Sequence, residues 1–168
     1  KADVGAETDI YIPRIYWTKD AELLAVQRLN RLQNQLDILH VNAATGASKV
    51  ILTDKSKTYI DFTFCDDLTY LDNGKQFLFS SEKNGYKHFY LYDMQGKLVN
   101  QMTNGSFEAL GMVGLDQKKK VLYYTSTEVS PLEEHLYAVS FSGKGKKKLS
   151  PNAGNHYINM SDDCSYYI

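Results

Sequence analysis

The chain has 168 residues, of which 43% are hydrophobic and 23% are charged, an ordinary balance for a globular chain. Nineteen basic and twenty acidic residues leave a net charge of −1, which excludes a strong electrostatic pull on nucleic acid or an acidic membrane. No run of about 18 apolar residues is present, so no membrane span is expected, and the first residues hold no apolar signal-peptide core.

Aromatic residues make up 12% of the chain, which favours strands because flat rings pack well on a pleated surface. Residues 9–16 alternate isoleucine with polar positions and predict a strand, with Pro13 at an edge or a bulge. Cys65 and Cys164 are 99 residues apart and show no metal-ligand spacing. We expect both to be free thiols, because two cysteines do not make a disulfide framework.

Residues 17–41 can be interpreted in two incompatible ways. Leucines spaced three, four and three apart are typical of the seam of an amphipathic helix; they are Leu29, Leu32, Leu36 and Leu39. The same stretch can form two strands, 23–32 and 36–41, folded about the polar residues 33–35. A short β-branched run at 48–52 and a polar loop at 53–58 follow.

An internal repeat decides between these readings. An Asp-containing turn precedes an apolar run three times, at 71–79, 115–124 and 160–168, with a spacing of 44 and then 45 residues. Later elements recur as well: 89–92 with the turn 95–97 corresponds to 136–139 with the turn 142–144. Four short antiparallel strands in about 45 residues is the period of a propeller blade.

The sequence therefore predicts an all-β fragment of a β-propeller with about three four-stranded antiparallel blades. The expected blades are 17–58, 68–105 and 107–154, with the start of a further blade at 155–168. In this register residues 17–41 supply the second and third strands of the first blade, and the strand interpretation replaces the helix. Because this segment is longer than its counterparts, we expect its hairpin to project beyond the blade.

Three stretches carry a resemblance to a known family: DIYIPRIYWT, LAVQRLNRLQNQLDI and FTFCDDLTYLDNGKQFLFSSEKNGYKHFYLY. They resemble the propeller domain of the dipeptidyl peptidase IV family of serine peptidases, of the prolyl oligopeptidase clan, in its bacterial branch. The resemblance implies a periplasmic or secreted enzyme that removes X-Pro or X-Ala dipeptides from peptide N-termini. It places the catalytic serine, aspartate and histidine in a separate C-terminal α/β-hydrolase domain.

No Gly-x-Ser-x-Gly elbow occurs in the 168 residues, so we expect no catalytic residue here and no activity from this piece alone. The resemblance implies that the propeller gates access and contacts the peptide substrate. It points to Phe62, in the loop 59–64, as a substrate-facing aromatic, although an ordinary core phenylalanine is the competing interpretation. The family places an arginine beside this aromatic, and Thr63 stands there instead.

Other polar groups favour structural interpretations. Glu133 and Glu134 are expected to be a solvated strand end, because surface charge pairs are ordinary. The four histidines show no zinc spacing, and aspartates at turns cap the local backbone; no metal or cofactor is predicted. The lysine runs 118–120 and 144–148 protect strand edges in this interpretation.

Two hypotheses for function remain open from the sequence. The first is the non-catalytic propeller portion of a dipeptidyl-peptidase-IV-like exopeptidase, serving substrate access and domain or subunit contacts. The alternative is a non-enzymatic propeller scaffold that binds protein or glycan partners. Both allow homo-oligomers through exposed blade edges.

Overall fold

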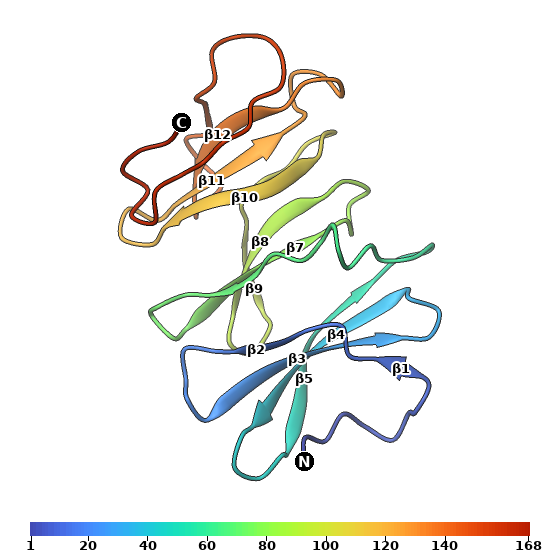
Figure 1. The fold of residues 1–168 in the computed structure, drawn as a ribbon. Coiled ribbons are helices and arrows are strands. Elements are labelled where there is room, and N and C mark those ends of the chain that lie inside the picture. The colour runs from blue at the N-terminus through green and yellow to red at the C-terminus, as the bar shows by residue number, and fades with distance from the viewer.

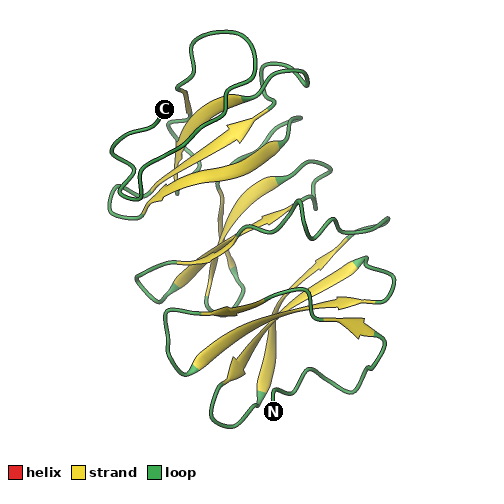
Figure 2. Cartoon of the chain, in the orientation of Figure 1, coloured by secondary structure: helices red, strands yellow, loops and turns green.

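The computed structural model describes residues 1–168 and contains strands and loops only. Figure 1 shows three antiparallel sheets following one another along the chain, from the blue N-terminal sheet to the orange C-terminal one. Figure 2 shows the same arrangement with every regular element drawn as a strand. The predicted all-β propeller fragment is confirmed. No helix long and apolar enough to cross a bilayer is present.

The first sheet has five strands because a proline divides one of its edge strands in two. Pro13 separates β1 from β2, and both short pieces pair with β3, so the sheet starts before Trp17. Proline cannot donate to a ladder and is therefore confined to such edges. The strands are β1 (Ile10–Tyr11), β2 (Ile15–Trp17), β3 (Leu23–Asn30), β4 (Gln35–Asn42) and β5 (Ser48–Lys55).

Residues 17–41 form a β-hairpin, as the repeat predicts, and not a helix. β3 and β4 pair from Leu23 opposite Asn42 to Leu29 opposite Leu36. Leu32, a member of the apparent helical seam, lies in the turn and is 75% exposed. The expectation that the hairpin projects beyond the blade is wrong, because neighbouring strands extend along it to its tip. β1 pairs with the β3 side and β5 with the β4 side.

The second and third sheets repeat one design of four consecutive antiparallel strands. The apolar runs that the repeat singles out, 77–79 and 121–124, lie in the second strand of each sheet. The second sheet comprises β6 (Leu68–Tyr70), β7 (Gln76–Ser81), β8 (His88–Asp93) and β9 (Leu98–Gln101). The third comprises β10 (Ala109–Asp116), β11 (Val121–Ser126), β12 (His135–Ser140) and β13 (Lys147–Lys148).

Two hydrophobic cores join the sheets face to face. The core between the first and second sheets contains Leu29, Leu36, Phe77, Phe79 and Tyr90, all at most 1% exposed. The core between the second and third sheets is built in the same way around Leu78, Phe89, Leu122 and Tyr124. Because the second sheet packs against a core on each face, its strands are apolar on both sides, which explains their nearly continuous apolar runs in the sequence.

Glycines in the last turn of a sheet allow the next close contact between sheets. Gly96, between β8 and β9, has φ +79°, and a Cβ there would lie 1.7 Å from the Ile51 carbonyl oxygen on β5. Gly143, between β12 and β13, repeats this with φ +73° and a distance of 2.7 Å to the Gln101 oxygen. The turn of each sheet thus rests directly on the outer strand of the sheet before it.

The last residues pack against the third sheet without forming a sheet of their own. A single bridge joins Met160 to Tyr167. A Cβ at Gly114 of β10 would lie 2.4 Å from the Met160 sulfur and 3.1 Å from the Cys164 sulfur. Both cysteines are free, Cys65 buried and Cys164 half-buried.

Candidate functional site

Phe62 lies in the long loop between β5 and β6, which connects the first sheet to the second. Its ring is half-buried and packs against the core between the first and second sheets. The ring also contacts a cation. The guanidinium carbon of Arg14, from the segment between β1 and β2, lies 5.7 Å from the ring centroid. This distance is within the range of a cation–π contact.

Arg14 is held in place by an acidic residue of the same loop. Its Nε donates to Asp66 Oδ2 at 3.1 Å, and Nη2 lies at the same distance from that oxygen. The Tyr16 hydroxyl donates to the other oxygen, Oδ1, at 3.0 Å. Burial, with Asp66 beside it, raises the pKa of Tyr16 to about 12, so the hydroxyl keeps its proton. The Arg14 side chain nevertheless remains 38% exposed and can meet a ligand.

The loop around Phe62 has a defined internal turn. The Asp61 carboxylate accepts hydrogen bonds from the Thr63 hydroxyl at 2.6 Å and from the Phe64 amide at 3.1 Å. These bonds hold the pKa of Asp61 below its usual value. At the start of the loop the Ile60 amide donates to the Gln33 carbonyl at 2.6 Å, which ties the loop to the β3–β4 hairpin. Phe62 is therefore presented from a constrained backbone.

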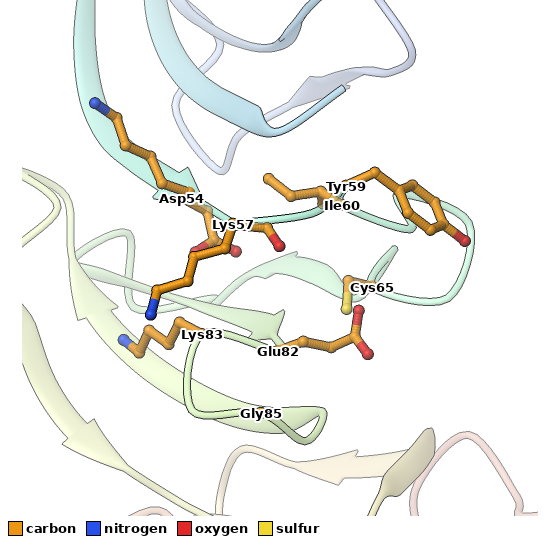
Figure 3. Close-up of a pocket in the computed structure, with 10 residues that line it drawn as sticks. Asp54, Lys57, Tyr59, Ile60, Cys65, Glu82, Lys83 and Gly85 are labelled. Carbon is orange, nitrogen blue, oxygen red and sulfur yellow. The ribbon is translucent and has the colours of Figure 1, made fainter. Parts of the chain in front are cut away.

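A cavity of about 420 Å³ opens on the other side of this loop, between β5 and the β7–β8 loop (Figure 3). Figure 3 shows the amines of Lys57 and Lys83 at one end of the cavity and the Tyr59 ring at the other. The Lys83 ammonium lies 3.7 Å from the Tyr90 ring centroid and donates to the Tyr92 hydroxyl at 2.9 Å. The lining of the cavity mixes positive and negative side chains and favours no single ligand charge.

The acidic and thiol groups of the cavity are shifted toward their neutral forms. Burial raises the pKa of Asp54 and of Glu82. Burial also raises the pKa of the Cys65 thiol to about 12. Because the thiolate is the reactive species, Cys65 is not poised to act as a nucleophile.

A histidine in the third sheet superficially resembles part of a catalytic triad. His135 is fully buried, with Nδ1 3.0 Å from the Ser150 hydroxyl and Nε2 3.0 Å from the Glu133 carboxylate. Ser150 is itself only 5% exposed, and its hydroxyl accepts a hydrogen bond from the Leu136 amide at 3.1 Å. No substrate can therefore approach this oxygen.

The second sheet repeats the same arrangement, which identifies it as a structural element. His88 lies 3.1 Å from the Thr103 hydroxyl, and that hydroxyl accepts from the Phe89 amide at 3.0 Å. Each histidine thus connects the start of the third strand of a sheet to the segment after its fourth strand. Glu133, predicted to be a solvated strand end, instead binds His135, and this hydrogen bond lowers the pKa of Glu133.

Two of the turn aspartates are bound by cations of the chain itself. Asp72 pairs with Lys19 at 2.8 Å, and Asp116 pairs with Lys119 at 3.1 Å. No group of three or more His, Cys, Asp or Glu side chains gathers as a metal ion would require.

The resemblance pointed to Phe62, and nothing in the sequence pointed to Arg14 beside it. The two residues are 48 positions apart, and the sequence around Phe62 shows only Thr63 where the family would place an arginine. The Arg14 guanidinium comes from the segment between β1 and β2, so no pattern near Phe62 could reveal it.

Comparisons with known proteins show the family and the fold. The family model described as "Dipeptidyl peptidase IV (DPP IV) N-terminal region" matches residues 2–168. Dipeptidyl peptidase 4 of Trichophyton rubrum is 30% identical over 96% of this chain and 22% of its own length. Its counterpart from Arthroderma otae is 29% identical over the same shares.

A solved structure shows the same fold. The crystal structure of Porphyromonas gingivalis dipeptidyl peptidase 4 superposes with a TM-score of 0.91 and 36% identity, over 99% of this chain and 23% of that one. The chain thus spans less than a quarter of the length of the relatives that it matches. It belongs to the family of dipeptidyl peptidase IV N-terminal regions.

Proposed function

We propose that this chain is the non-catalytic propeller portion of a serine exopeptidase that releases N-terminal X-Pro or X-Ala dipeptides. In this proposal a separate α/β-hydrolase domain carries out the chemistry, and this chain contributes to substrate access and binding. The observation that supports the role most directly is the contact of the Arg14 guanidinium, 5.7 Å from the ring centroid, with Phe62 on the constrained loop between the first and second sheets.

The pair offers two kinds of contact that a peptide needs. The Phe62 ring supplies a flat apolar surface, and the partly exposed Arg14 guanidinium supplies N–H donors for a peptide carbonyl or carboxylate. Asp66 fixes the guanidinium before any ligand arrives, so little side-chain freedom is lost on binding. Arg14 would thereby take the place of the arginine that Thr63 fails to supply.

The test is steady-state hydrolysis of a Gly-Pro amide by the full-length protein that contains this chain. We expect Phe62→Ala to raise KM about tenfold, the usual effect of losing an apolar contact, with kcat little changed. Tyr59→Ala is the matched control, because Tyr59 is an aromatic of the same loop that is 58% exposed and does not contact Arg14. Equal KM values for the two variants would refute a substrate contact at Phe62.

The proposal extends to location and assembly. A peptidase that acts on peptides outside the cytoplasm would be periplasmic or secreted, and cell fractionation with an antibody against the full-length protein tests this. Exposed apolar residues of β2, Ile15 at 59% and Trp17 at 66%, support contact with another protein surface. We propose that such a surface serves domain or subunit contacts.

A further inference from the structure

Lys87 is a lysine whose ammonium group is almost completely enclosed. It lies at the end of the β7–β8 loop, and its side chain is 3% exposed. The ammonium donates to the Phe64 carbonyl, and to the Leu110 carbonyl at 2.7 Å. It also lies 2.7 Å from Asp67 Oδ2. The two carbonyls accept hydrogen bonds from the ammonium, and the Asp67 carboxylate pairs with its charge.

The backbone of Lys87 is fixed to the third sheet. Its amide donates to Glu108 Oε2 at 2.6 Å, and its carbonyl accepts from the Ala109 amide at 3.0 Å. The Phe64 ring centroid lies 4.6 Å from the ammonium, which adds a cation–π contact in a buried setting. The lysine therefore joins the second sheet, the third sheet and the loop that carries Phe62.

Lys87 contacts the loop at two points, Phe64 and Asp67, on either side of residues 65–66. Phe64 comes two residues after Phe62, and Asp67 is the residue before β6. Asp67 is tied to β7, because its carbonyl accepts from the Ser80 amide at 3.2 Å. Between these anchors, the loop is held by Arg14 and Tyr16 through Asp66 from one side and by Lys87 from the other.

We propose that Lys87 is a positioning residue that holds the loop 61–67 so that Phe62 meets the peptide in one orientation. This inference rests on the proposed function of Phe62. Lys87 is enclosed and does not reach a ligand; its effect passes through the Phe64 carbonyl and Asp67. Replacing it by methionine keeps the aliphatic stem but leaves two carbonyls without their donor and Asp67 without its opposite charge, so the loop gains freedom.

How firmly Lys87 holds the loop can be measured without an activity assay. The probe is the thiol of Cys65 in the same loop, a residue that is 2% exposed. In the full-length protein, modification of Cys65 by a maleimide is followed by peptide mass spectrometry. We expect Lys87→Met to speed this modification at least about tenfold, since opening the loop exposes a protected thiol. Lys75→Met, at an exposed lysine of the same sheet, is the control and should leave the rate unchanged.

The kinetic test is a double-mutant cycle on Gly-Pro amide hydrolysis. We expect Lys87→Met to raise KM about threefold to tenfold with kcat little changed. In the Phe62→Ala background the same substitution should have no further effect on KM, because there is no ring left to orient. Asp67→Asn, which removes the ion pair and leaves the bonds to the carbonyls, is a milder variant if Lys87→Met does not fold.

The outcomes separate the two proposals. Faster Cys65 modification together with a KM effect that disappears in the Phe62→Ala background supports a positioning role. An unchanged modification rate, or a KM effect that adds to that of Phe62→Ala, overturns it. If Phe62→Ala alone leaves KM unchanged, the proposed function of Phe62 fails, while the modification rate still tests the hold of Lys87 on the loop.

Discussion

Substituting Gly96 by alanine tests the contact between successive sheets more sharply than any other single change. A methyl group there would lie 1.7 Å from the Ile51 carbonyl oxygen and 2.6 Å from its carbonyl carbon. Gly74, in the β6–β7 turn of the same sheet, is the matched control. Its φ is +63°, close to the +79° of Gly96, but a Cβ there meets nothing within 4 Å.

The structure allows the two costs to be separated. Both substitutions place an alanine in left-handed backbone, which costs about 1 kcal/mol. Only Gly96→Ala also forces β5 away from the β8–β9 turn, and overpacking of this kind adds about 1–3 kcal/mol. Gly96→Ala should therefore lower the free energy of unfolding by about 2–4 kcal/mol, against about 1 kcal/mol for Gly74→Ala. Gly143→Ala, with 2.7 Å to the Gln101 oxygen, should fall between them.

The measurement is urea-induced unfolding followed by far-ultraviolet circular dichroism. The single tryptophan, Trp17, is 66% exposed and would report the transition poorly by fluorescence. Equal destabilisation by Gly96→Ala and Gly74→Ala would show that the β8–β9 turn does not rest on β5, and the packing of the arc described above would then be wrong.

Three further predictions concern stability and assembly. Burial lowers the pKa of His40 to about 4, while an unfolded histidine titrates near 6.5. Its contribution to stability is present above pH 6.5 and is lost as the pH falls toward 4, by up to about 3 kcal/mol. His40→Asn should make the urea midpoint depend less on pH between pH 6.5 and 4. An unchanged pH dependence would show that His40 is not the group responsible. Gln27 is 1% exposed, and neither polar atom of its side chain has a hydrogen-bond partner; Gln27→Met should raise the unfolding free energy by about 1–2 kcal/mol in urea melts, and a loss would show that the amide has a partner. Light scattering of the purified chain should show self-association, weakened by Trp17→Lys, whereas a clean monomer at high concentration would count against exposed apolar edges as contacts.

The strands could be predicted because the repeat imposed one register on the whole chain. Residues 17–41 have a helical leucine spacing, and only their place between two turn positions of the repeat made them a hairpin. Tertiary pairing with β1 and β5 then overrides the local helical pattern. The same pairing explains why the hairpin does not project. The residues of the hairpin could not show that strands on both sides extend to its tip.

The candidate site was only partly predictable. The family resemblance pointed to Phe62, which stays a prediction, but nothing in the sequence pointed to Arg14 or Lys87. Lys87 looks like a surface lysine in a polar loop, because two of its three partners are backbone carbonyls that carry no side-chain signature. The paired histidines did leave a signal: His88 and Thr103 are 15 residues apart, as are His135 and Ser150, and each pair recurs in register with the repeat.

Hydrolysis of a Gly-Pro amide by the full-length protein that contains this chain tests the central claim most directly. Our proposal predicts turnover with release of the intact Gly-Pro dipeptide, and a rise in KM when Phe62 is replaced by alanine. A folded full-length protein that fails to hydrolyse this substrate would contradict the peptidase assignment and favour a propeller scaffold that binds protein or glycan partners.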